Sequence, residues 1–243
     1  MNQSEIAGRT ILITGCSSGI GYCVAHGLKR RGYPVIASAR KPDDVERLAS
    51  EGLDCLQIDL DDPDSIDQAV ENLEDRTGRR IYGLFNNAGF GQPGAVEDLR
   101  RDVLRAQFET NVFGTLELTN RLLPWMRAAG EGRIIQNSSL LGFVALAYRG
   151  AYNASKYALE GLYDTLRLEL RGSGIHVCLI EPGPITSRFR ENALAKFQQY
   201  VEVEGSAHRQ RYEAMLARLQ HEGDVAPFTL PPEAVLKKVI HAL

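Results

Sequence analysis

The sequence has 243 residues, of which 44% are hydrophobic and 24% charged, a composition typical of one globular α/β domain with a sizeable core. Its 28 basic and 31 acidic residues give a formal net charge of −3, so nothing in the charge balance favours nucleic-acid binding. No run of about 18 apolar residues is present, so we predict no membrane span. Residues 1–7 lack a basic stretch followed by an apolar one, so we expect no secretory signal.

The cysteines and histidines predict neither a disulfide nor a metal site. The cysteines show no C-x-x-C spacing and fall in predicted core strands or in the first helix and its turn. We therefore expect buried, reduced thiols in a cytoplasmic protein. They are Cys16, Cys23, Cys55 and Cys178. The histidines show no metal-ligand spacing. They are His26, His176, His208, His221 and His241.

Apolar runs alternate with helical patterns along the chain. Strands are predicted at residues 10–14, 34–39, 55–60, 81–86, 133–138 and 175–181. Helices are predicted at residues 20–31, 42–50, 64–77, 98–111, 112–128, 150–171 and 233–243. This alternation predicts a single α/β domain, residues 1–243, with a doubly wound parallel sheet and helices on both faces. Ligands of such folds gather at the carboxyl ends of the strands.

Residues 187–232 interrupt the alternation. The segment is polar and helical, rich in Gln, Arg and Glu, and carries scattered aromatic residues. We interpret it as an insertion that covers the substrate site. Pro231 and Pro232 open the last predicted helix, and no strand follows it before Leu243.

A glycine-rich turn joins the first strand to the first helix. Its glycines allow a sharp turn and let a pyrophosphate approach the N–H groups at the helix N-terminus. The spacing is G-x-x-x-G-x-G, and the alternative is a turn that binds no ligand. The candidate cofactor-binding residues here are Gly15, Ser17, Ser18, Gly19, Ile20 and Gly21.

The end of the second strand indicates which dinucleotide binds. An NAD site places a carboxylate here for the ribose 2′-OH, but this sequence has Ala39 followed by Arg40. A guanidinium suits a 2′-phosphate, so the sequence favours NADP(H). The alternative is that Arg40 is a solvated loop residue.

Tyr152 and Lys156 lie four residues apart, on one face of a predicted helix. An ammonium near a phenol favours the phenolate, so we expect Lys156 to lower the pKa of Tyr152. A tyrosine tuned in this way can exchange a proton with a carbonyl or an alcohol. Alone, the pair is more typical of a solvated helix face than of a catalytic site.

Taken in order, these motifs resemble the short-chain dehydrogenase/reductase family. The resemblance is carried by Thr14-Gly-x-x-x-Gly-Ile-Gly21, Asn86-Asn-Ala-Gly89, Asn111, Ser139, Tyr152-x-x-x-Lys156 and Pro182-Gly183. It implies a Rossmann fold and a nicotinamide cofactor. Gly15 to Gly19, Ala39 to Pro42 and Ile180 to Ile185 look most like a branch of bacterial NADP-dependent aldehyde reductases, similar to retinol and 17β-hydroxysteroid dehydrogenases.

The resemblance also implies catalytic roles. Tyr152 would be the general acid in reduction, and Ser139 would hydrogen-bond the substrate oxygen, with the neighbouring Ser138 as a rival. Lys156 would tune Tyr152 and bind the nicotinamide ribose. Asn111 would hold a water that links Lys156 to solvent.

Further residues would meet the cofactor according to the same resemblance. Asp59 and Leu60 would contact the adenine, and either Thr186 or, as we prefer, Ser187 would bind the carboxamide. The remaining cofactor-binding candidates are Asn87, Ala88, Gly89, Pro182, Gly183 and Ile185. The family sheet normally gains a seventh strand after the last helix, so we expect either that the chain is truncated before this strand or that its sheet is one strand short.

The expected substrate is a small lipophilic aldehyde, ketone or alcohol. Seven residues are candidates for its apolar pocket or for ordinary core: Phe90, Phe143, Leu146, Phe189, Phe197, Tyr200 and Met215. Two other functions stay open, a non-catalytic NADP(H)-sensing protein and an epimerase or dehydratase with tightly held NAD.

Family members commonly form homodimers, so we expect one here. The candidate leucines for the interface, or for the core, are Leu116, Leu118, Leu122, Leu159, Leu162 and Leu166.

Overall fold

The computed structural model describes residues 6, 8–221, 223 and 227–243. The expected absence of a secretory signal concerns residues that lie almost wholly outside this range. The predicted insertion at residues 187–232 is described except for positions 222 and 224–226.

Six parallel strands form one sheet in the order β3-β2-β1-β4-β5-β6. Their bounds are β1 Ile11–Ile13, β2 Val35–Ala39, β3 Asp54–Gln57, β4 Gly83–Asn86, β5 Gly132–Asn137 and β6 Ile175–Ile180. The predicted doubly wound α/β architecture is confirmed, and six strands are present in the described residues. The third strand is shorter than predicted because β2 ends at Ala39, whose partner Gln57 is the last residue of β3.

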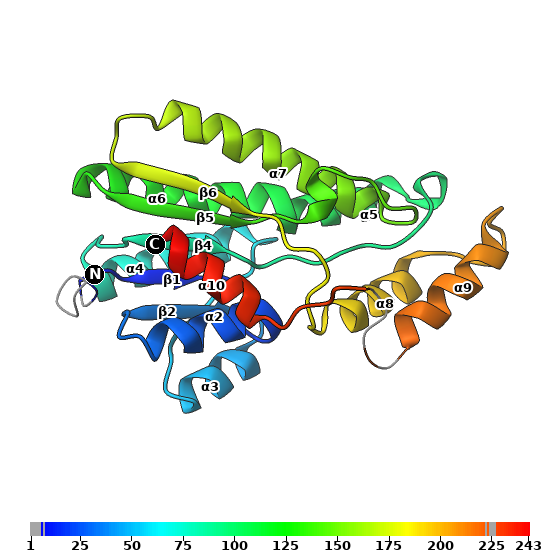
Figure 1. Ribbon diagram of the computed structural model, residues 1–243, viewed down its shortest axis with the longest axis horizontal. Helices are drawn as coiled ribbons and strands as arrows, with labels where there is room; N and C mark the ends of the chain where they lie inside the picture. The colour runs from blue at the N-terminus through cyan, green and yellow to red at the C-terminus, as the bar shows by residue number, and fades with distance from the viewer. Residues whose placement is uncertain (1–5, 7, 222, 224–226) are drawn as a thin grey trace.

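Helices cover both faces of the sheet (Figure 1). Their bounds are α2 Gly19–Lys29, α3 Pro42–Ser50, α4 Pro63–Thr77, α5 Arg101–Phe108, α6 Thr115–Ala129, α7 Gly150–Glu169, α8 Phe189–Tyr200, α9 Arg209–Gln220 and α10 Glu233–Ala242. One hydrophobic cluster joins the sheet to α4, α6 and α7, and a second joins it to α2, α3 and α10. Alternate residues of β1 divide between them, since Leu12 belongs to the first and Ile11 and Ile13 to the second.

The two helices predicted at 98–111 and 112–128 are one continuous helical run with a π-helical segment, η2 (Glu109–Gly114), between α5 and α6. The predicted break therefore corresponds to a local widening of the helix. Gly114, the last residue of this segment, packs against the Leu60 carbonyl so closely that a Cβ atom on Gly114 would collide with that backbone group. A π-segment of this kind is often found at functional sites.

The predicted insertion carries α8 and α9, which lie together to one side of the sheet (Figure 1). Its two ends meet, because Leu230 N donates to Pro184 O at 3.0 Å and Thr186 N donates to Leu230 O at 3.0 Å. A separate apolar cluster joins Ala95 to Phe197, Val201 and Tyr212. The insertion is thus packed on the loop that follows β4.

The prediction that all four cysteines are buried is wrong for three of them. Cys16 is buried, whereas Cys23, Cys55 and Cys178 are partly exposed. Cys55 and Cys178 lie on β3 and β6, the two edge strands, where one side of the strand has no neighbour. All four are free thiols.

Among the described residues, no helix is both long and apolar enough to cross a membrane. The same residues contain no group of three or more His, Cys, Asp or Glu side chains placed to hold a metal ion.

Candidate active site

The glycine-rich turn lies against the end of β4. Gly15 and Gly19 have φ of 69° and 58°, in the left-handed region that favours glycine. A Cβ atom on Gly15 would lie 2.7 Å from Ala88 Cα, and one on Gly21 would lie 2.6 Å from Asn87 Nδ2. The absence of side chains at these positions therefore lets the turn and the Asn87–Ala88 segment come together.

Hydrogen bonds join the turn to the far side of the site. Thr14 Oγ1 accepts from the backbone N–H groups of Asn87 and Ala88, both at 3.0 Å. Asn87 Nδ2 donates to the Thr14 and Gly15 carbonyls, and its Oδ1 accepts from Asn137 Nδ2 at 3.1 Å.

Asn137 O in turn accepts from Lys156 Nζ at 2.8 Å. Sequence reasoning missed Thr14 and Asn137 as site residues; their positions at the carboxyl ends of β1 and β5 are the signal that could have identified them.

The geometry of the turn fits a dinucleotide pyrophosphate. Helix α2 begins directly after the turn, its first turn carries no acidic residue, and the Ser18 side chain makes no capping hydrogen bond. Its N-terminal N–H groups and helix dipole are thus available to an anion. The residues that would hold such a group are those of the turn, Ser17 to Gly21.

The residues predicted to bind the adenine half of the cofactor lie at or just after the carboxyl ends of β2 and β3. Arg40 follows β2 and is exposed. The Asp59 carboxylate accepts from Asp61 N at 3.1 Å, so it is already part of a local turn, and Leu60 is buried. Arg40 is therefore free to turn towards a ligand, whereas the Asp59 carboxylate is engaged.

Ser187 lies next to the glycine-rich turn, since a Cβ atom on Gly19 would be 2.9 Å from Ser187 Cβ. Thr186 is exposed, and its backbone N–H pairs with Leu230. This contact favours Ser187 over Thr186 as the residue near the cofactor. Pro182 O accepts from Leu140 N at 3.0 Å, Ile185 packs on the second core cluster, and Gly183 is exposed.

Ser139 and Tyr152 are brought together at the carboxyl end of β5. Ser139 is 9% exposed, and its hydroxyl hydrogen-bonds Tyr152. Burial raises the pKa of Tyr152 to about 12, and the hydrogen bond from Ser139 opposes this effect. The predicted lowering of the Tyr152 pKa by Lys156 is therefore wrong here, because burial of the phenol outweighs any nearby charge.

Lys156 is 6% exposed, and its ammonium lies 5.5 Å from the centroid of the Tyr152 ring. Burial lowers the pKa of Lys156 to about 8, while the negative charge of Glu160 partly offsets this change. The side chain is held by Asn137 O rather than by a carboxylate. Lys156 thus combines a fixed position with a titration close to neutral pH.

The lowered pKa of Lys156 predicts a pH-dependent stability. Between about pH 8 and the ordinary value of 10.5, the unfolded chain binds more protons than the folded one, so the free energy of unfolding rises with pH. Over this interval, the free energy of unfolding of the wild type should rise by about 1–3 kcal/mol relative to that of Lys156→Met. Urea unfolding of both proteins at about pH 7.5, 9 and 10.5 measures the difference. A constant difference across this range would contradict the assignment.

Ser138, the alternative to Ser139, has its hydroxyl in a hydrogen bond with another side chain. Its hydroxyl donates to Glu160 Oε1, and a Cβ atom on Gly142 would lie 2.8 Å from the same oxygen. The Ser138 hydroxyl is therefore engaged with the Glu160 carboxylate, which is 8% exposed. This arrangement favours Ser139 as the oxygen-binding residue.

Asn111 lies in the π-segment and is 2% exposed. Its Nδ2 donates to Phe90 O at 3.0 Å and to Ser155 Oγ at 3.1 Å, and its Oδ1 accepts from Phe90 N at 3.1 Å. A Cβ atom on Gly89 would also lie 3.1 Å from Asn111 Oδ1. Asn111 therefore holds the Gly89–Phe90 segment against α7, and its predicted water relay remains a prediction.

The seven apolar residues predicted for the pocket are dispersed. The Phe189 ring lies 5.3 Å from the Tyr152 ring in an edge-to-face contact. Phe197 is buried core, whereas Phe143 and Leu146 are about half exposed. Tyr200 and Met215 pack partly buried in two small clusters, and the ammonium of Lys196 lies 4.9 Å from the Phe90 ring. Phe197 therefore belongs to the core, the alternative left open for these residues, whereas Phe189 lies against Tyr152.

Residues 9–197 match the family model described as short chain dehydrogenase. The chain belongs to the short-chain dehydrogenase/reductase family. The resemblance inferred from the motifs is thereby confirmed, and the chain is an oxidoreductase of that family with a fold that binds a nicotinamide cofactor.

Relatives and solved structures agree with this membership. The chain is 48% identical over 238 residues to the uncharacterized oxidoreductase YbbO of Escherichia coli K12, covering 98% of this chain and 82% of that protein. It is 34% identical over 244 residues to the NADPH-dependent 3-dehydrocapnine reductase of Ornithobacterium rhinotracheale, covering 96% and 83%. A short chain dehydrogenase/reductase of Burkholderia phymatum, solved in complex with NAD, superposes with a TM-score of 0.83 at 22% identity, covering 98% and 86%.

Proposed function

We propose that this protein reduces lipophilic aldehydes or ketones with NADPH, and that Tyr152 is the proton donor. The observation that carries the proposal is that Ser139, Tyr152 and Lys156 lie in one site: the Ser139 hydroxyl acts on the pKa of the Tyr152 phenol, and the Lys156 ammonium lies 5.5 Å from the centroid of the Tyr152 ring. A phenol that stays protonated at neutral pH is suited to give a proton to an oxygen that gains negative charge.

Each residue of the site has a distinct role in this proposal. Ser139 and Tyr152 donate hydrogen bonds to the substrate oxygen, where charge develops. Lys156, fixed by Asn137 and 5.5 Å from the centroid of the Tyr152 ring, would hold the ribose of the cofactor and keeps a positive charge beside the phenol. The nicotinamide, when bound, supplies the hydride. Phe189, packed edge-to-face on Tyr152, helps to exclude water from the reacting carbonyl.

The proposed cofactor is NADP(H) because Arg40, and no carboxylate, follows β2. The reductase of Ornithobacterium is named as NADPH-dependent, which supports this choice. The neighbour solved with NAD shares only the fold, so its cofactor does not argue against NADPH.

Reversing the charge of Arg40 should change the cofactor preference. In Arg40→Glu, the Kd for NADPH should rise at least about tenfold through loss of a charge-assisted contact and added repulsion of the 2′-phosphate, while the Kd for NADH changes little. Titration of protein fluorescence measures both constants. Arg171→Glu, an exposed position that follows α7 at the far end of the helix from Tyr152, is the matched control. Equal losses for both cofactors in Arg40→Glu would refute the assignment.

A screen of NADPH oxidation against aldehydes and ketones distinguishes the remaining functions. A reductase consumes NADPH in proportion to the carbonyl supplied. A cofactor sensor binds NADPH without consuming it, and an epimerase or dehydratase converts substrate with no net change in cofactor. The presence of Ser139, Tyr152 and Lys156 in one site favours the reductase.

We further propose a cytoplasmic homodimer that pairs through α6 and α7. Three of the six candidate leucines, Leu118, Leu122 and Leu159, are buried in the core of the protein. Leu162 is 37% exposed, and Leu116 and Leu166 are partly buried, so these three are the candidates left for an interface.

A further inference from the structure

Helix α9 presents one face to the residues that precede α7. Arg211, Met215 and Arg218 are spaced at four and three residues and so lie on the same face of the helix. Arg211 Nη1 donates to the Tyr148 hydroxyl at 3.5 Å, and Arg149 Nη1 lies 3.8 Å from Met215 Sδ. We call these five residues, Tyr148, Arg149, Arg211, Met215 and Arg218, the α7–α9 seam.

The seam holds three guanidinium groups, and no ion pair to any of them is found within residues 6, 8–221, 223 and 227–243. Arg149 donates to the Tyr148 carbonyl at 3.3 Å. Burial, and to a smaller extent the charge of Arg218, lowers the pKa of Arg149. A partly buried cation beside a like charge is costly unless an anion compensates it.

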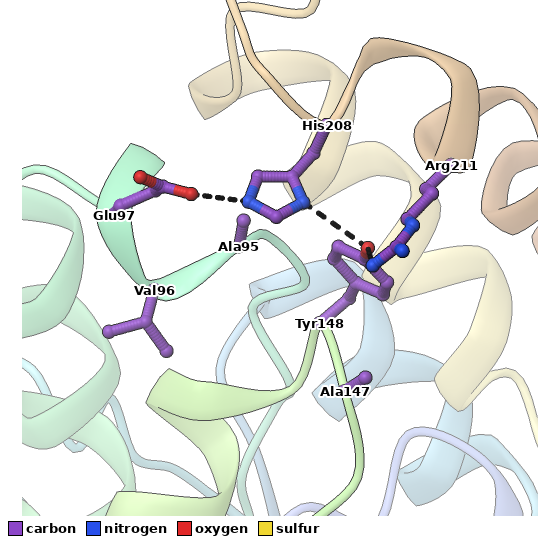
Figure 2. Close-up of a pocket in the computed structure, with 7 residues that line it drawn as sticks. All are labelled: Ala95, Val96, Glu97, Ala147, Tyr148, His208 and Arg211. Carbon is purple, nitrogen blue, oxygen red and sulfur yellow. Dashed lines mark hydrogen bonds and ion pairs between the residues drawn. The ribbon is translucent and has the colours of Figure 1, made fainter.

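The Glu97 carboxylate, which lies near the seam, is already engaged. Glu97 Oε1 lies 2.5 Å from His208 Nε2, and the other ring nitrogen of His208 lies 3.3 Å from the Tyr148 hydroxyl. Figure 2 shows the His208 ring between these two groups, with Arg211 on the far side of Tyr148. Glu97 therefore points towards His208 rather than towards the guanidinium groups.

The seam borders a cavity of about 480 Å³ that is lined by Ala95, Val96, Glu97, Ala147, Tyr148, His208 and Arg211 (Figure 2). Tyr148 has φ of 62°, a left-handed conformation that costs a non-glycine residue on the order of 1–3 kcal/mol. Its carbonyl is held by Gly94 N at 3.1 Å, and its hydroxyl is directed to His208 and Arg211. The backbone is thus held in an unfavourable conformation that places this hydroxyl beside the cations.

We propose that the α7–α9 seam binds an oxyanion through Arg149 and Arg218, with Arg211 on the same face of α9. Arg149 directly precedes α7, the helix that carries Tyr152, so the seam and the proposed proton donor share one structural element. The oxyanion is either the anionic terminal group of the carbonyl substrate or a free phosphate-like ion. The first source rests on the proposed function, and the second does not.

Phosphate binding tests the seam without any turnover. Inorganic phosphate should raise the Tm of the wild type above that in sodium chloride of equal ionic strength. Arg149→Met and the exposed Arg218→Gln should lose most of this rise. Arg209→Gln, an exposed arginine of the same helix that is two residues from Arg211 and so lies off the seam face, should keep it.

Steady-state kinetics distinguish an oxyanion that belongs to the substrate from a free phosphate-like ion. An aldehyde that ends in a carboxylate is compared with its methyl ester, which has the same chain but no charge. If the substrate supplies the oxyanion, kcat/KM for the wild type should favour the acid, and this preference should fall about tenfold or more in Arg149→Met and Arg218→Gln through a higher KM. If a free ion is the ligand, the preference is absent, and phosphate alone distinguishes the variants from the wild type.

The proposal is overturned if the wild type neither responds to phosphate nor prefers the acid. It is equally overturned if the rise in Tm caused by phosphate falls as much in Arg209→Gln as in Arg149→Met and Arg218→Gln. A protein that shows the phosphate response but reduces no carbonyl would refute the proposed function and leave the oxyanion site standing.

Discussion

Replacing Tyr152 by phenylalanine should lower kcat by about 10²–10⁴, because the variant loses the proton that the substrate oxygen must receive. The ring remains, so its edge-to-face contact with Phe189 at 5.3 Å is kept and the pocket should keep its shape. The Kd for NADPH should change little. Single-turnover oxidation of NADPH, with fluorescence titration of the cofactor, separates the two quantities.

Tyr157→Phe provides the matched control for this experiment. Tyr157 lies on the same helix, five residues after Tyr152, but is 47% exposed. Its hydroxyl should contribute nothing to the reaction, so the variant should turn over at the wild-type rate. Near-normal turnover of Tyr152→Phe would refute the role of Tyr152 as proton donor.

Adding one methyl group at Gly21 should disrupt the cofactor turn. A Cβ atom at this position would collide with the Gly15 carbonyl and lie 2.6 Å from Asn87 Nδ2. Neither neighbour can give way cheaply, since the first is backbone and the second holds the Thr14 and Gly15 carbonyls. Overpacking of this kind costs about 1–3 kcal/mol, which corresponds to a fall in Tm of several degrees for a chain of this length. The Kd for NADPH should rise at least about tenfold as the turn is displaced.

Gly161→Ala is the same substitution with the opposite expectation. Gly161 lies in the middle of α7, and nothing lies within 4 Å of a Cβ atom built on it. Alanine has a higher helix propensity than glycine, so the free energy of unfolding of this variant should rise by up to about 1 kcal/mol. The variant should bind NADPH as the wild type does. Calorimetry and cofactor titration of the two variants side by side measure the contrast. A Gly21→Ala protein as stable as Gly161→Ala would show that the turn is not closely packed.

Local pattern was sufficient to predict the layout of the fold. The alternation of apolar runs and helical patterns predicted the parallel sheet, and short runs such as residues 10–14 predicted its strands to within a residue or two. The limits of β3 could not be obtained in this way, because they depend on where its neighbour β2 ends. The break predicted between Asn111 and Val112 was a real irregularity, but only the backbone of the folded chain shows that it is a π-segment rather than a gap between helices.

The sequence by itself determined which chemical groups this protein has to work with: a glycine-rich turn, an arginine after the second strand, and a serine, tyrosine and lysine in family order. Only the tertiary structure decided how those groups behave. Burial raises the pKa of Tyr152, Glu160 occupies the Ser138 hydroxyl, and Asn137 joins Lys156 to the cofactor turn. The physical reason is that desolvation and hydrogen-bond partners depend on residues far apart in the chain, whereas spacing along the chain reports only local structure.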